Sequence, residues 1–176
     1  FFQLLKFYGS ASAALKEIPA MAARGGRGKP LQPYPESPAL TELEACARAG
    51  VQVIAQPEAD YPPWLRAIPD APPLLFVKGH PHLWKKPVAA IVGARNASAA
   101  GRALAKTWAA ALSQNGVTVV SGLARGIDAA AHEGSLAGGT VAVVAGGVNH
   151  VYPPENTGLY ERIAAEGAVV SENGLE

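Results

Sequence analysis

The sequence contains little cysteine, little net charge and no long apolar run, and each shortage excludes a class of protein. Its one cysteine, Cys46, excludes an internal disulfide and a cysteine-based zinc site, which is typical of a reducing compartment. Lys and Arg number 15 against 14 Asp and Glu, so the chain is not polybasic, although a local group of arginines remains compatible with nucleic-acid binding. We expect a cytoplasmic protein without membrane contact, because no apolar run approaches a membrane span and no signal peptide is recognisable.

Familiar enzyme and metal motifs are missing as well. The segment from Gly93 to Ser98 reads Gly-Ala-Arg-Asn-Ala-Ser and lacks the G-x-G-x-x-G pattern of dinucleotide binding. No P-loop pattern G-x-x-x-x-G-K-[S/T] occurs either. The four histidines have no spacing typical of metal ligands. These absences predict no cofactor and no metal ion.

Composition and spacing divide the chain into two parts. Hydrophobic residues make up 49% of it, enough for a packed core, and its length suits one domain with a small companion. Apolar residues at helical spacing predict two short helices within Phe1–Ala23, joined at Gly9-Ser10. Glycine, proline and basic residues from Arg24 to Pro38 predict a linker. We place a small all-α N-terminal domain with its linker at residues 1–36 and a second domain at residues 37–176.

The second domain alternates apolar, β-branched stretches with helical ones. From Val88 onward we predict strands at 88–92, 117–121, 140–145 and 168–171, and helices at 98–115, 127–137 and 155–166. Upstream we predict a short helix at 41–49, strands at 51–54 and 74–77, and a helix start at the prolines 62 and 63. The four later strands are apolar enough to be buried on both faces. Right-handed crossovers then predict a parallel α/β sheet of the Rossmann kind with flanking helices.

Glycine, arginine and polar residues follow the carboxyl end of each of these four strands. In chain order they are Gly93 and Arg95; Ser121, Gly122, Arg125 and Gly126; Gly146, Gly147 and Asn149; Ser171 and Glu172. The carboxyl ends of parallel strands meet at one edge of the sheet, where helix N-termini and backbone N–H groups bind anions. Glycine lets the backbone approach a ligand closely, and arginine offers a planar donor fork that fits phosphate. We therefore expect a phosphate-binding edge.

Individual side chains at this edge have competing interpretations. Arg95 directly follows a predicted buried strand, which favours ligand contact, whereas Arg125 either binds the ligand or faces water. Asp128 and His132 are four residues apart on one helix face. They form a general-base pair, or Asp128 caps the first helical turn and bonds a neighbouring loop. Tyr152 either stacks on a base or fixes its loop.

The residues at these strand ends closely resemble those of a known family. The matching segments are Ile91–Arg95 with Ser98 and Gly101; Ser121–Asp128 with Ala131 and His132; and Gly146-Gly147, Tyr152-Pro153, Asn156 and Ser171-Glu172. Together they resemble the DNA-processing protein A family (DprA, also called Smf), as do Tyr61-Pro62, Leu65, Ile68 and Phe76–Gly79 upstream. The Phe1–Ala23 segment resembles the family's small N-terminal domain of sterile-alpha-motif or helix-hairpin-helix type.

The resemblance implies a bacterial protein that binds single-stranded DNA through an extended Rossmann domain. It implies protection of incoming strands during natural transformation, help in loading the RecA recombinase, a homodimer, and no catalytic reaction. The residues expected to bind nucleic acid are Gly93, Arg95, Asn96, Ser121, Gly122, Arg125, Gly126, Gly146 and Gly147. The residues expected to support that pocket are Asp128, His132, Asn149, Tyr152, Asn156, Ser171 and Glu172.

The sequence also departs from the family pattern at three positions. Ala94 stands where serine is frequent, Ala100 where an aromatic residue is common, and Asn149 where aspartate is usual. None of the three removes a charge that would hold phosphate. The sequence stops before the latter half of the family's Rossmann domain, so we expect this domain to be incomplete at its C-terminal half.

Two other function classes compete with DNA binding. One is a nucleotide-processing Rossmann enzyme of the phosphoribohydrolase (lysine-decarboxylase-like) type, which uses a proline-glycine-glycine loop. Ala145-Gly146-Gly147 matches that loop only in part, and the Gly-Thr pair that should follow is absent. The other is a scaffold whose pocket has lost its ligand and whose surface binds a protein partner.

Overall fold

The computed structural model describes residues 2–25 and 31–175, and its contacts divide the chain into two units between Leu43 and Glu44. Residues 26–30 of the predicted linker lie outside the described residues. The domain boundary after residue 36 remains a prediction. Across the described ranges, no helix combines the length and apolar character needed to cross a membrane.

The N-terminal unit contains the two predicted helices, α1 (Phe2–Tyr8) and α2 (Ala11–Arg24). The hydroxyl of Ser10 accepts a hydrogen bond from the Ala13 amide at 3.1 Å, which caps the start of α2. The expectation of two helices joined at Gly9-Ser10 is therefore confirmed.

The start predicted for the next helix, at Thr41, is wrong. Helix α3 spans Glu36–Arg48, so it includes residues that the sequence assigned to the linker. Pro38 lies in its first turn, where a proline costs no hydrogen bond because the first N–H groups of a helix have no partner within it. The proline is a helix-start signal here and not a linker signal.

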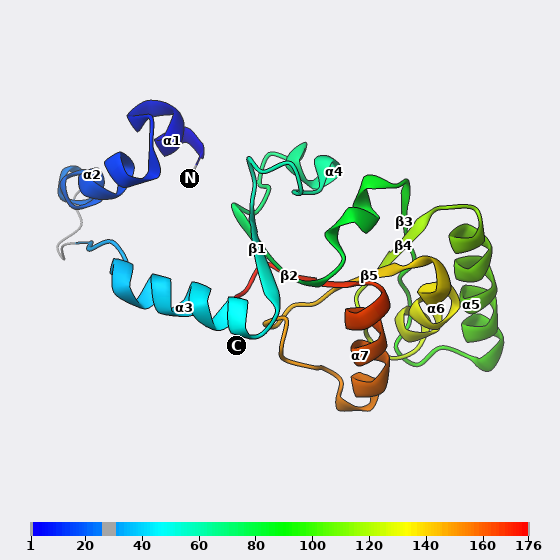
Figure 1. The fold of residues 1–176 in the computed structure, drawn as a ribbon. Coiled ribbons are helices and arrows are strands. Elements are labelled where there is room, and N and C mark those ends of the chain that lie inside the picture. Colours follow the sequence, from blue (N-terminus) through cyan, green and yellow to red (C-terminus); the bar gives the residue numbers. More distant parts are fainter. Residues whose placement is uncertain (1, 26–30, 176) are drawn as a thin grey trace. The chain divides into compact units, whose positions relative to one another are not determined.

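A six-stranded sheet forms the centre of the second unit (Figure 1). Its strands are β1 (Val51–Ala55), β2 (Leu74–Gly79), β3 (Val88–Ala90), β4 (Thr118–Ser121), β5 (Thr140–Val143) and β6 (Ala168–Ser171), in the spatial order β1-β2-β6-β5-β4-β3. Strands β3 to β6 run parallel to one another, which confirms the predicted Rossmann-like arrangement. Strand β2 pairs antiparallel with β6, and β1 pairs antiparallel with β2, so the complete sheet is mixed.

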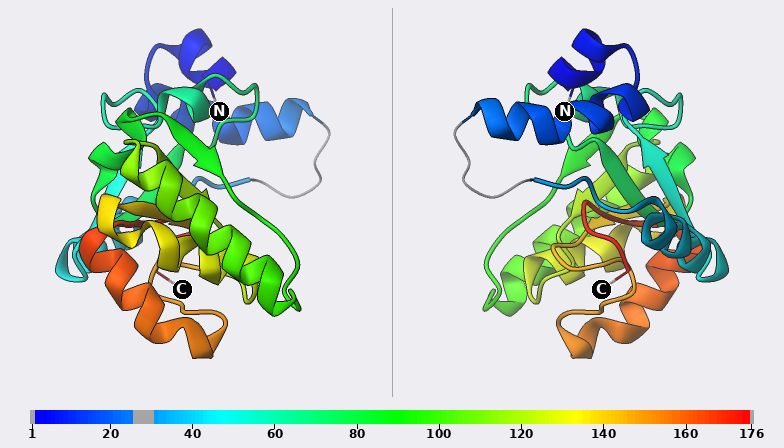
Figure 2. Two further views of the ribbon diagram at one scale, coloured as in Figure 1. Left: turned by 90° about the vertical axis from the view of Figure 1, so that its right-hand side faces the viewer. Right: turned by 90° about the vertical axis from the view of Figure 1, so that its left-hand side faces the viewer.

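Three helices follow the parallel strands and cover one face of the sheet. They are α5 (Ala99–Gln114), α6 (Ile127–Ser135) and α7 (Thr157–Glu166), and they lie side by side in Figure 2. The short helix α4 (Pro63–Arg66) begins at the predicted prolines. The start predicted for α7 at Glu155 is wrong, because residues Pro154–Asn156 form a separate 3-10 turn. Single 3-10 turns also occupy Pro81–Lys85 and Leu136–Gly138.

Buried side chains fill both faces of the central strands. Val169 points toward the helices and packs with Ile163 of α7. Its neighbour Val170 points to the opposite face, where Leu83 and Trp84 cover it. This alternation is the two-residue repeat of a β-strand, and it fixes the strand ends from which the loops of the site emerge.

Strand β3 contradicts the expectation that every strand is buried on both faces. It ends at Ala90 and lies at the edge of the sheet with β4 as its one partner. Val88 is 38% exposed, and Val92 just beyond the strand is 72% exposed. An apolar composition does not distinguish an edge strand from a central one, since the difference is set by which strand pairs where.

Candidate functional site

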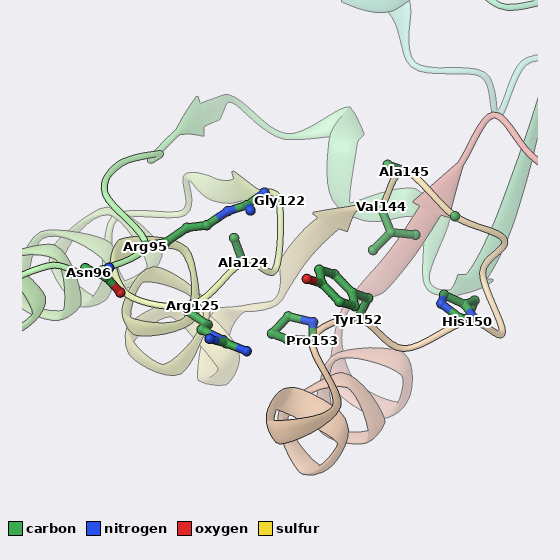
Figure 3. Close-up of a pocket in the computed structure, with 11 residues that line it drawn as sticks. Arg95, Asn96, Gly122, Ala124, Arg125, Val144, Ala145, His150, Tyr152 and Pro153 are labelled. Atoms are coloured by element: carbon green, nitrogen blue, oxygen red, sulfur yellow. The ribbon is translucent and has the colours of Figure 1, made fainter.

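A cavity of about 320 Å³ lies at the carboxyl ends of β3, β4 and β5 (Figure 3). It is lined by Arg95, Asn96, Gly122, Ala124, Arg125, Val144, Ala145, Gly146, His150, Tyr152 and Pro153. Three loops that are distant in sequence thus meet at one edge of the sheet. Six of the predicted site residues are among those that line it, namely Arg95, Asn96, Gly122, Arg125, Gly146 and Tyr152.

Several predicted binding residues lie beside the cavity and do not line it. Gly93 packs against the side chain of Ile127, and the Ser121 hydroxyl donates to the Ile91 carbonyl at 2.6 Å. Gly126 lies against the backbone of Ala94 and Arg95. The carbonyl of Gly147 accepts a hydrogen bond from the His150 amide at 2.9 Å. These residues shape the loops, and their contact with a ligand remains a prediction.

The buried carboxylate of Asp128 joins two of the three loops. It accepts hydrogen bonds from the backbone amides of Gly122 at 3.2 Å and of Gly93 and Ala124 at 3.4 Å each. Asp128 is 5% exposed, so these amides replace the water that a carboxylate needs. This geometry matches the alternative in which Asp128 bonds a neighbouring loop. No hydrogen bond between Asp128 and His132 occurs in the described part of the chain.

His132 lies inside the helix layer and not at the cavity. It has no exposed surface, and its Nδ1 lies 2.9 Å from the hydroxyl of Thr140, which donates its own proton to the Val119 carbonyl at 2.7 Å. Nδ1 is therefore assigned as the donor, which leaves Nε2 as an acceptor without a hydrogen-bond partner among the described residues. Burial lowers the pKa of His132 to about 4, and the backbone of Ser121 acts in the opposite direction.

This buried histidine predicts a loss of stability in mild acid. Because the pKa of His132 is lower in the folded chain than the ordinary 6.5, protonation favours unfolding. The contribution of uncharged His132 to the free energy of unfolding is fully present above about pH 6.5. It is lost as the pH falls toward 4, by about 3 kcal/mol in total. Urea denaturation from pH 7 to 4 measures it. His132→Asn, which keeps a donor toward Thr140, should flatten the profile, whereas the exposed His150→Gln should retain it; equal slopes in all three chains would contradict the prediction.

The loop after β4 is held in an unusual conformation beneath the cavity. Leu123 is fully buried and has a φ of 59°, a left-handed value that bulky residues rarely adopt. Its carbonyl accepts a hydrogen bond from the Asn156 side-chain amide at 2.8 Å. This contact ties Asn156 to the loop that carries the cavity residues Ala124 and Arg125, and a supporting role of Asn156 in ligand binding remains a prediction.

The loop after β5 is held from the neighbouring strand β6. The hydroxyl of Ser171 donates to the Gly146 carbonyl at 2.6 Å, and the side-chain amide of Asn173 donates to the Ala145 carbonyl at 2.7 Å. Ser171 therefore supports the loop without lining the cavity. Glu172 and Asn149 are exposed and do not line it.

The two cavity arginines differ in their partners. Arg95 takes part in no ion pair among the described residues, and Figure 3 shows its side chain extending toward Gly122. Arg125 pairs through its Nε with the carboxylate of Glu155. Within the described ranges, no group of three or more His, Cys, Asp or Glu side chains could hold a metal ion. Among the described residues, the cavity thus presents one cation without an ion-pair partner, which suits it to bind an anion.

Sequence reasoning missed five of the lining residues. They are Ala124, Val144, Ala145, His150 and Pro153. His150 and Pro153 flank Tyr152, which is 63% exposed and is joined to Pro153 by a cis peptide bond. The sequence contained a signal for these residues, because the loop from Gly146-Gly147 to Tyr152-Pro153 was identified at both of its ends. The residues between and beside those ends were therefore candidates for the cavity lining.

Comparisons with known proteins place the chain beside one family. The model for DNA recombination-mediator protein A matches residues 52–176, and the model for a DprA-like N-terminal HHH domain matches residues 1–45. DNA processing protein DprA of Bacillus subtilis (strain 168) is 37% identical over 146 residues, which cover 81% of this chain and 48% of that protein. The expected helix-hairpin-helix character of the N-terminal segment agrees with the second model.

Two solved structures share the fold. The structure of DNA processing protein A from Streptococcus pneumoniae has a TM-score of 0.66 and 36% identity, over 74% of this chain and 48% of that one. DNA processing protein A from Helicobacter pylori, solved to show how it binds single-stranded DNA, has a TM-score of 0.65 and 28% identity, over 70% and 56%. The chain spans about half the length of these relatives.

Proposed function

The chain belongs to the DNA-processing protein A family, and from that premise we propose that its cavity binds the backbone of single-stranded DNA. The observation that carries the proposal is the guanidinium of Arg95, which has no ion-pair partner among the described residues and lies at a cavity formed by three loops. Arginine binds phosphate through charge-assisted hydrogen bonds. The Helicobacter pylori relative binds single-stranded DNA, which supports the same ligand here.

Beside the cations, the cavity offers an aromatic surface for a base. Tyr152 is largely exposed, and in Figure 3 its hydroxyl points toward the arginine side of the cavity. Stacking on an aromatic ring tolerates every base, because each base has a π-face. Phosphate contacts with stacking and few base-edge contacts suit a strand of any sequence.

The wider role that we propose follows from family membership. The protein protects incoming strands and helps to load the RecA recombinase during natural transformation, acting in the cytoplasm as a homodimer and without catalysis. The competing nucleotide-processing activity needs an acid or base beside the substrate. His150 lines the cavity and can exchange a proton, but none of the lining residues is an aspartate or the glutamate that this type of enzyme uses near its glycine loop, which favours binding over hydrolysis.

Replacing Arg95 with alanine should weaken binding to an oligo-dT strand about tenfold or more, since a charge-assisted hydrogen bond is lost. The slope of log affinity against log salt should flatten by about 0.7, the value for one phosphate contact on a single strand. A filter-binding titration at several salt concentrations measures both quantities. Arg162→Ala on the exposed surface of α7 is the matched control. If the two variants bind equally well, Arg95 does not hold a phosphate.

A further inference from the structure

The second arginine of the cavity is already occupied by a carboxylate. Arg125 lines the cavity and forms an ion pair with Glu155, and the two side chains are 56% and 50% exposed. One hydrogen bond brings the partners together, because Asn156 follows Glu155 and bonds the carbonyl of Leu123, two residues before Arg125. The pair is thus fixed by the loops that form the cavity.

We propose that Glu155 is a competitor for the phosphate site of Arg125, so that this second phosphate subsite opens only when a DNA phosphate displaces the carboxylate. The inference rests on the proposed DNA binding and adds a residue that sets its strength. A carboxylate and a phosphate both bind the donor fork of a guanidinium, so they exclude one another at Arg125. Arg95, which has no such partner among the described residues, makes the first contact.

The exposure of the pair makes the exchange feasible. Ion pairs open to solvent are weak, because water and salt screen them and both long side chains lose freedom. A phosphate held close by Arg95 therefore has only a small barrier to overcome at Arg125. Glu155 lowers affinity modestly in this arrangement and does not abolish it.

Glu155→Gln tests the inference, with Glu133→Gln as its matched control. Glu133 is also a half-exposed glutamate in an ion pair, with Lys106 at 3.0 Å, but it does not line the cavity. Both changes remove one negative charge. Glu155→Gln should bind oligo-dT roughly two- to fivefold more tightly than the unchanged chain, whereas Glu133→Gln should bind with unchanged affinity.

A double-mutant cycle shows whether Glu155 acts through Arg125. In a chain that already carries Arg125→Gln, adding Glu155→Gln should produce no gain. An equal gain in that background, or no gain in either background, overturns the inference and leaves DNA binding intact. Failure of the unchanged chain to bind oligo-dT at all overturns the proposed function and this inference with it.

Discussion

Replacing Gly126 with alanine is expected to lower the free energy of unfolding by about 2 to 5 kcal/mol and to weaken binding to single-stranded DNA about as much as Arg95→Ala does. Gly126 has a φ of 79° and a ψ of −119°, a conformation open to glycine and costly for other residues. An added Cβ would lie 2.5 Å from the carbonyl oxygen of Arg95 and closer still to that of Ala94. Those carbonyls cannot yield without moving the backbone that carries the Arg95 side chain.

Gly126→Ala is therefore expected to lose both stability and DNA affinity, and the two losses can be measured separately. Urea denaturation gives the change in stability, and oligo-dT binding at a temperature where the variant is folded gives the change in affinity. Gly158→Ala is the matched control, since Gly158 lies in α7 with open space around it and no left-handed φ. That variant should be more stable by about 0.5 kcal/mol and bind DNA normally. A Gly126→Ala chain that retains both properties would show that Arg95 need not be held where the structure places it.

The parallel part of the fold was predictable because its signals are local. Strands β3 to β6 are short apolar runs, and one helix of adequate length separates each strand from the next. Right-handed crossovers then fix the neighbours, and with them the edge at which Arg95, Gly122 and Gly146 meet. Loops at the carboxyl ends of such strands converge whatever their sequence separation.

Features that depend on distant partners were not predictable in the same way. The antiparallel addition of β1 and β2 is decided by pairing across the sheet, as is the exposure of Val88 at its edge. The ion pair of Arg125 joins loops whose proximity is a consequence of the Asn156 bond to Leu123. The sequence predicted that Arg125 either binds the ligand or faces water. It did not predict a partner within the chain, which the structure identifies as Glu155.

Removing the carboxylate of Asp128 tests how the loops are held together. Asp128→Ala leaves the amides of Gly93, Gly122 and Ala124 without their acceptor, and a buried donor without a partner costs about 1 to 3 kcal/mol. Since the donors are only partly buried and water reaches the cavity, we expect a total loss of about 2 to 4 kcal/mol in the free energy of unfolding. DNA affinity should fall as well, because the Gly93 and Gly122 loops lose their shared anchor.

The same variant separates the two interpretations of Asp128. As a general base, Asp128 would be needed for a reaction and its removal would leave stability almost unchanged, whereas as a loop anchor it is needed for stability in the absence of any substrate. Asp70→Ala, an exposed aspartate outside the cavity, should change the unfolding free energy by less than about 0.5 kcal/mol. Asp128→Asn keeps one acceptor oxygen but turns an NH₂ group toward amide donors, so its stability should lie between those of Asp128→Ala and the unchanged chain. That ordering follows from hydrogen-bond chemistry alone, and a stability of Asp128→Ala equal to that of Asp70→Ala would remove Asp128 from the framework of the cavity.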